Sequence, residues 1–300
     1  MMGLKPETIA RRLLNKYCYE CPDDIDLEEL MYAEKLNLKF EPLAGCQGKI
    51  IFNKREGIIT IDSGITNRHR VKFIAGHEMG HFFLERKLCK PVLANEVKAV
   101  SNGAIIEHLD RFVSTGNLWS SRLRELRANQ FAAELLMPEA WFKEEVATKR
   151  LTVNMLGETA GYFDMSLSAT AFRYAELGET PCAIIFSKDG KVEWCKVHDQ
   201  FPFRNCPQGK FLSEDQSKAG MLHQAFKSKR KNSTINTRYF SHYRYSGAGV
   251  YPAEEHLSGI VSAYTWFDDA VNYGGVFLHE ESAAMKRYNS TLTILTLWNG

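Results

Sequence analysis

The residues with the clearest chemical spacing are two histidines and a glutamate in the segment Ala75-Gly-His-Glu-Met-Gly-His81. On a helix with roughly 100° per residue, His77 and His81 lie about 40° apart, so both imidazoles can bind one tetrahedral ion. Glu78 then lies beside the ion, where it can take a proton from a water that the ion acidifies to a pKa of about 7. The His-Glu-x-x-His pattern therefore predicts two metal ligands and a general base, as in zinc peptidases.

The residues around this motif favour a buried helix. Asn67 is a candidate N-cap for a helix from Arg68 to Leu84, and apolar residues share one broad face with the histidines. Gly76 and Gly80 each cost about 1 kcal/mol relative to alanine inside a helix, so we expect another segment to approach closely there. The alternative is that both histidines are only hydrogen-bonded core residues, which is costly beside a buried carboxylate.

A catalytic zinc site needs a third protein ligand, and the best candidate is Glu125. It begins an apolar stretch that stops at Pro138, which predicts a largely buried helix. Glu125 and Asn129 share one face of that helix, so both need polar partners in the interior. We expect Glu125 to bind the ion and Asn129 to accept the second N–H of a ligand imidazole.

Two alternatives to this assignment stay open. Glu107 and Asp110 are acidic residues that could supply the third ligand, although neither begins so apolar a helix. Glu125 could instead lie at the surface and pair with Arg122 or Arg124.

Three sequence blocks together resemble the ImmA/IrrE family of metallopeptidases. They are Lys49–Phe52 with Gly57–Asp62, Phe73–His81, and Glu125–Pro138. The resemblance covers about residues 5 to 178 and implies a zinc endopeptidase, with manganese as the alternative ion. It implies a helix-turn-helix transcriptional repressor as substrate, in a stress or DNA-damage response or in the regulation of mobile elements. By motif match it implies His77, His81 and Glu125 as metal ligands and Glu78 as the base.

One feature departs from that family. His81 and Glu125 are 44 residues apart, which is longer than the family leads us to expect. We therefore expect an insertion around Lys87 to Asn117 that overhangs the cleft and affects substrate access.

Composition indicates a soluble, cytoplasmic protein of more than one domain. The 300 residues are 44% hydrophobic and 25% charged, which is typical of a globular chain with more than one core. The first twenty residues contain no signal-peptide core, and no run reaches the roughly 18 apolar residues of a membrane span. Seven irregularly spaced cysteines favour reduced thiols, and a metal or redox role for Cys18 and Cys21 is a minor alternative.

The order of expected elements predicts an α+β protein with three parts. Residues 1–150 read as a zincin-like metallopeptidase domain, in which a small sheet packs against two ligand helices. Its strand pair is a hairpin whose turn, Asn53–Gly57, ends in a glycine of the kind that hairpins often use at positive φ. Residues 180–300 are expected to form a C-terminal α/β sensor or regulatory domain similar to GAF domains.

Residues 151–179 connect these parts and resemble a helix-turn-helix, with helices expected at Met155–Phe163 and Leu167–Leu177. Residues 152–178 have one basic and three acidic residues, which is unfavourable for phosphate contacts. We therefore favour a packing or substrate-docking role over DNA binding.

A basic, aromatic segment lies between Gln216 and Pro252, although the whole chain has a net charge of only +2. It has seven basic residues and no acid, so it could bind single-stranded DNA or an anionic small ligand as an activator. The candidate binding residues are Lys227, Lys229, Arg230, Lys231, Arg238, Tyr239 and Arg244. The alternative for this segment is a solvated basic loop. For the whole protein, the alternative is a nucleic-acid- or ligand-binding regulator with a structural or vestigial zinc site.

Overall fold

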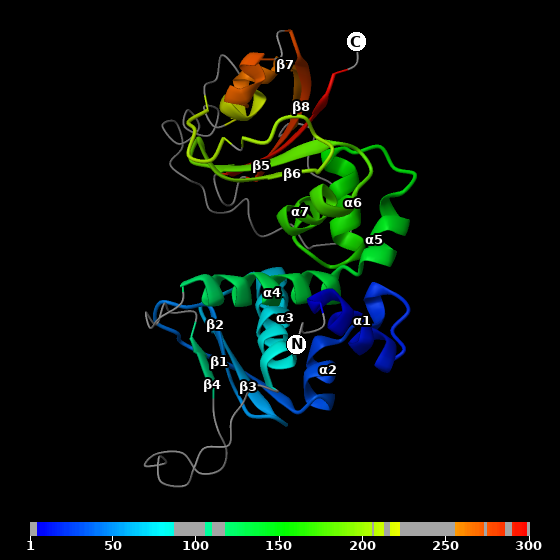
Figure 1. Cartoon of the computed structure of the whole chain (residues 1–300), viewed down its shortest axis with the longest axis vertical. Helices are drawn as coiled ribbons and strands as arrows, with labels where there is room; N and C mark the ends of the chain where they lie inside the picture. Colours follow the sequence, from blue (N-terminus) through cyan, green and yellow to red (C-terminus); the bar gives the residue numbers. More distant parts are fainter. Residues whose placement is uncertain are drawn as a thin grey trace, which may run out of the picture. The chain divides into compact units, whose positions relative to one another are not determined.

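The structure, a computed structural model, describes residues 5–86, 106–109, 118–205, 207–212, 217–222, 256–272, 275–285 and 290–298. The chain divides into two compact units, Met1–Trp141 and Phe142–Gly300 (Figure 1). This division precedes the expected boundary at residue 150. Residues 151–179 belong to the same compact unit as the C-terminal strands.

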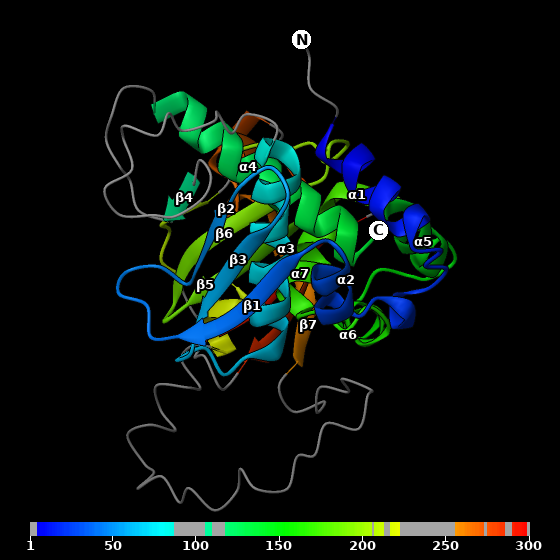
Figure 2. The same cartoon turned by 90° about the horizontal axis from the view of Figure 1, so that it is seen from below.

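The first unit combines a four-stranded mixed sheet with helices, so it is α+β. Its helices are α1 (Pro6–Lys16), α2 (Leu27–Ala33), α3 (Arg68–Glu85) and α4 (Leu118–Leu136). Its strands are β1 (Leu36–Glu41), β2 (Gly48–Phe52), β3 (Gly57–Asp62) and β4 (Ile106–Leu109). The strand order is β1-β3-β2-β4, with β1 parallel to β3 and the other pairs antiparallel. Helix α3 packs behind β2 and β3 in Figure 2 and also packs against α4.

Helix α3 has the capped start that its sequence predicts. The Asn67 side chain accepts a hydrogen bond of 3.1 Å from the Arg70 amide, which satisfies one of the open N–H groups of the first turn. Every residue from Ile74 to Phe82 is buried, because the sheet and α4 cover the helix. The two histidines therefore lie in the best-packed part of α3.

The β2–β3 hairpin is also as expected, except at its glycine. Ile50 faces Ile59 across the ladder, and both are fully buried. Gly57 does not adopt a positive φ, so that expectation is wrong. A Cβ on Gly57 would lie 2.9 Å from both Leu36 Cδ2 and Phe52 Cβ, so close packing between strands requires the glycine.

The second unit contains a five-stranded antiparallel sheet. Helix α5 (Glu139–Val146) crosses the division between the units, and α6 (Val153–Tyr162) and α7 (Leu167–Leu177) follow. The strands are β5 (Cys182–Lys188), β6 (Lys191–Val197), β7 (His256–Ser262), β8 (Phe277–Met285) and β9 (Ser290–Leu297). Their order is β6-β5-β9-β8-β7. One face of the sheet carries an apolar core that includes Ile185, Phe201, Trp266, Phe267 and Leu295.

The two helices that resemble a helix-turn-helix belong to this unit. Helix α7, the second of the pair, packs against β5 and β6 and buries Ala171 and Tyr174. Helix α6 begins at Val153, whose amide donates a 2.7 Å hydrogen bond to Glu281 of β8. The two helices therefore pack against the C-terminal sheet, as the favoured packing role predicts.

Some expected features lie outside the described residues. They include most of the insertion between Lys87 and Asn117, together with the basic residues from Lys227 to Arg244. Within that insertion only β4 is described, and it extends the sheet by pairing with β2. Among the helices that the structure does describe, none is long and apolar enough to cross a membrane.

The two glycines of α3 contact α4 at different distances. A Cβ on Gly80 would lie 3.0 Å from the Ala128 Cα and carbonyl oxygen, whereas one on Gly76 would lie 3.4 Å from the Ala132 Cβ. The first contact is tighter than ordinary packing, and it involves backbone that cannot rotate away. The expected close approach of a second segment is therefore confirmed, most strongly at Gly80.

We predict that Gly80→Ala lowers the thermal unfolding midpoint of the metal-free protein, while Gly76→Ala leaves it unchanged or raises it. Each substitution stabilises the helix by up to about 1 kcal/mol through the higher helix propensity of alanine. At Gly80, however, overpacking against Ala128 destabilises the fold by about 1 to 3 kcal/mol. Differential scanning calorimetry of both variants tests this. Equal midpoints for the two would contradict the packing difference.

Candidate metal centre

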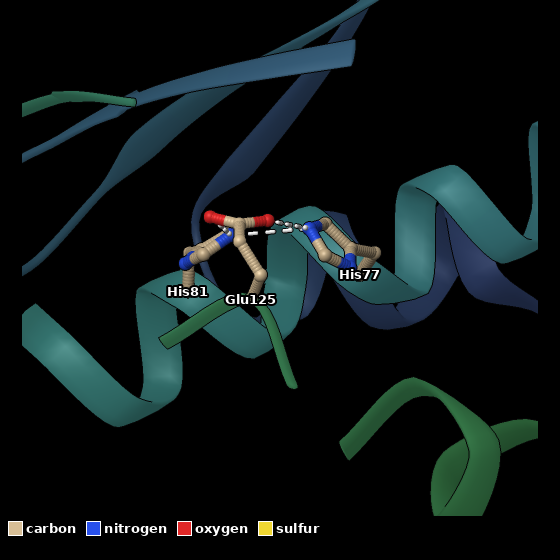
Figure 3. A group of neighbouring side chains, drawn as sticks. All are labelled: His77, His81 and Glu125. Atoms are coloured by element: carbon tan, nitrogen blue, oxygen red, sulfur yellow. Dashed lines mark hydrogen bonds and ion pairs between the residues drawn. The ribbon is translucent and has the colours of Figure 1, made fainter. Parts of the chain in front are cut away.

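Three side chains from α3 and α4 converge on one point (Figure 3). His77 Nε2 lies 3.1 Å from His81 Nε2 and 3.1 Å from Glu125 Oε2. His81 Nε2 lies 3.5 Å from Glu125 Oε1. One turn of α3 separates the histidines, and the packing of α4 on α3 brings in the glutamate.

These distances fit a shared metal ion. Zinc binds histidine nitrogen and carboxylate oxygen at about 2.0 to 2.2 Å, and tetrahedral angles then separate ligand atoms by about 3.3 to 3.6 Å. The separations of 3.1 to 3.5 Å are close to that range. Two histidines and a glutamate are also a donor set of catalytic zinc sites. The cluster is therefore compatible with a metal site.

Each histidine has a partner on the ring nitrogen that faces away from the cluster. His77 Nδ1 lies 2.8 Å from Asn129 Oδ1, next to a ligand ring as the helical spacing led us to expect. His81 Nδ1 lies 2.9 Å from Glu85 Oε1. Arg124, considered above as a surface partner of Glu125, donates a hydrogen bond to Glu85 Oε2.

Sequence reasoning did not find Glu85 or its link to Arg124. The available signal was the position of Glu85, four residues after His81 on the same helix, where side chains are neighbours. The link to Arg124 had no such signal, because 39 residues separate the two positions.

Glu78 occupies a buried position between α3 and the sheet. Its side chain is 2% exposed, and it follows the ligand His77 directly in the chain. A Cβ on Gly48 would lie 2.9 Å from Glu78 Oε1 and 2.4 Å from Ile74 Cγ2. Gly48 of β2 therefore leaves the space that the Glu78 carboxylate occupies, a role that the sequence alone did not indicate.

The charges in the cluster favour a bound cation. Burial lowers the pKa of His81, but hydrogen bonds to Glu125 and Glu85 and the charges of Glu125 and Glu78 raise it to about 9. Burial raises the pKa of Glu125, but hydrogen bonds from His77 and His81 hold it well below its ordinary range. Without a metal, the cluster therefore holds an ionised Glu125 and a proton on His81 at neutral pH. A metal ion that binds here displaces that proton.

The structure says less about Glu107 and Asp110, the alternative candidates for the third ligand. Glu107 lies in β4 opposite Ile51 of β2, and its side chain is outside the described residues, as is Asp110. Among the described side chains, Glu125 is the acid that lies next to both histidines.

We predict that Glu125→Ala weakens zinc binding more than Asn129→Ala does. The first change removes a ligand atom, whereas the second removes only the partner of His77 and should cost about 10- to 100-fold in affinity. Glu107→Ala should bind zinc normally. Competition with a chromophoric chelator measures all three, and zinc loss in Glu107→Ala with normal binding in Glu125→Ala would contradict the assignment of the third ligand.

Comparisons with known proteins relate part of this chain to a peptidase family. A search of curated protein sequences finds no match for the chain. A solved structure described as a Mycobacterium tuberculosis transcriptional regulator is similar in fold, with a TM-score of 0.53 and 12% identity. The similarity covers 97% of this chain and 75% of that one. The family profile of the M78 peptidases, described as the IrrE N-terminal-like domain, matches residues 34–174, which include the whole metal cluster. These residues of the chain therefore belong to the IrrE N-terminal-like family of peptidase domains.

Proposed function

We propose that this protein is a zinc-dependent endopeptidase that cleaves a helix-turn-helix transcriptional repressor. The observation that carries the proposal is the convergence of His77, His81 and Glu125, with Glu78 next to His77 on the same buried helix. The membership of residues 34–174 in a peptidase family supports it. Cytoplasmic action fits a substrate that binds DNA.

In this proposal each residue has a separate role. His77, His81 and Glu125 hold the zinc, and Asn129 keeps the His77 ring oriented through its Nδ1. When bound, zinc acidifies water and polarises the peptide carbonyl. Glu78 accepts the proton of the attacking water and delivers it to the amine of the leaving peptide. Its buried position between α3 and β2 limits its motion, which keeps the carboxylate oriented for that transfer.

The same proposal predicts that Glu78→Gln retains zinc but does not cleave, whereas His77→Ala loses both properties. Removing a base need not remove an ion, because Glu78 is not among the three ligand residues. The test incubates each protein, in the presence of added zinc, with the repressor encoded beside its gene and looks for a single cut by mass spectrometry. Metal analysis of the same samples is the control.

Two outcomes of that test would change the proposal. Near-normal cleavage by Glu78→Gln would refute the role of the base. Stoichiometric zinc with no cleavage by the unmodified protein would favour the alternative, a nucleic-acid- or ligand-binding regulator whose zinc site is structural or vestigial.

We also propose that the second unit is a regulatory domain similar to GAF domains. The proposal is supported by its five-stranded antiparallel sheet, against which α6 and α7 pack. Single-stranded DNA is the first activator to test, and an anionic small ligand is the alternative. Support comes from the charge of the segment between Gln216 and Pro252, which has seven basic residues and no acid.

This regulatory proposal predicts that neutralising Lys229, Arg230 and Lys231 together weakens oligonucleotide binding and flattens its salt dependence. Each lost phosphate contact reduces the number of counterions released on binding. Fluorescent oligonucleotide titrations at several salt concentrations measure both effects, and zinc content should not change. An unmodified protein that binds no oligonucleotide at low salt would contradict the DNA proposal.

A further inference from the structure

We infer that Glu85 is a positioning residue for the ligand His81, and that Arg124 holds Glu85 in place. The inference rests on the metal site of the proposed function. It concerns how that site is kept ready to bind an ion.

The two nitrogens of His81 face different partners. Nδ1 lies 2.9 Å from Glu85 Oε1, while Nε2 lies 3.1 Å from His77 Nε2 and 3.5 Å from Glu125 Oε1. A carboxylate only accepts hydrogen bonds, so Nδ1 must carry the proton that it donates to Glu85. When a metal ion displaces the other proton, the lone pair of the neutral imidazole is on Nε2, which faces the cluster. Glu85 thus selects the tautomer that binds a metal.

Burial makes this selection effective. His81 is 2% exposed and Glu85 is 5% exposed, so water competes little for either group. A buried carboxylate is costly unless it is paired with a charge. Arg124 supplies that charge by donating to Glu85 Oε2, which leaves Oε1 for the histidine.

The position of Arg124 also links the two ligand helices. It precedes the ligand Glu125 on α4, while Glu85 lies one turn after the ligand His81 on α3. The Arg124–Glu85 pair therefore fixes the distance between α3 and α4 next to the site. A second contact between these helices joins Asn129 of α4 to His77 of α3.

The two histidines differ in the charge of their partners. His77 contacts the neutral amide of Asn129, whereas His81 contacts a carboxylate. A carboxylate on the far nitrogen makes an imidazole a stronger donor to a metal than an amide does. We therefore expect the loss of Glu85 to affect both the orientation and the donor strength of His81.

A buried carboxylate elsewhere in the first unit, paired with a half-exposed arginine, provides a matched control. Glu134 of α4 is 1% exposed and its Oε1 lies 2.6 Å from Arg11 Nε of α1. Like Glu85, it is a buried carboxylate that joins two helices through an arginine. It differs in accepting its hydrogen bonds from Arg11 and from the Glu139 amide.

The test compares full-length wild-type protein with Glu85→Ala, Glu85→Gln, Arg124→Ala and Glu134→Ala. Zinc affinity is measured by competition with a chromophoric chelator, and thermal unfolding is measured without metal. Glu85→Ala should bind zinc about 10- to 100-fold more weakly. Glu85→Gln keeps an acceptor oxygen of similar reach, so it should lose less zinc affinity than Glu85→Ala. The zinc affinity of Arg124→Ala should also lie between those of Glu85→Ala and the wild type. Glu134→Ala should unfold at a lower temperature yet bind zinc normally.

A spectroscopic measurement separates positioning from general stability. Long-range 1H–15N NMR of the zinc-loaded wild type should show His81 protonated at Nδ1 and bound through Nε2. Wild-type zinc affinity in Glu85→Ala, or an equal loss in Glu134→Ala, would overturn the inference. Zinc binding by a wild type that cuts no repressor would contradict the proposed function alone, because the affinity series still decides the role of Glu85.

Discussion

The close packing of α3 on α4 is the constraint on which the candidate metal site of His77, His81 and Glu125 depends. Two of the candidate ligands lie on α3 and one on α4, and a Cβ on Gly80 of α3 would come within 3.0 Å of the Ala128 backbone of α4. A larger side chain there would separate the helices and move Glu125 away from both histidines. The conformational cost of a glycine inside a helix is therefore offset by the distance that it permits between the ligands.

Electrostatics in the cluster follow from the same packing. Burial alone would favour neutral forms of His81 and Glu125, yet the pKa of His81 is raised to about 9 because Glu125, Glu85 and Glu78 surround it. The protein thus arranges negative charge around a position where a cation fits. Arg124 balances part of that charge from the outer side, through Glu85.

The family match and the compact units divide the chain at different places. The match extends from residue 34 to residue 174, through α6 and most of α7, whereas the first compact unit ends at Trp141. Helices α6 and α7 pack on the C-terminal sheet through contacts such as Val153 with Glu281. Helices α6 and α7 therefore lie in the second compact unit although the family match extends into them.

The local features could be predicted from the order of the residues: the capped helix that carries His77 and His81, the β2–β3 hairpin, and the stripe that places Glu125 and Asn129 on one face of α4. These depend on neighbours a few residues apart, whose spacing on a helix or strand is fixed by backbone geometry. Other features became visible only in the folded chain. Strand β4 extends the sheet at β2, and Arg124 donates a hydrogen bond to Glu85. Gly48 makes room for Glu78, and Gly57 is needed for close packing rather than for its φ. Each of these contacts joins segments of the chain that only packing brings together, and no local periodicity encodes the distance between their side chains.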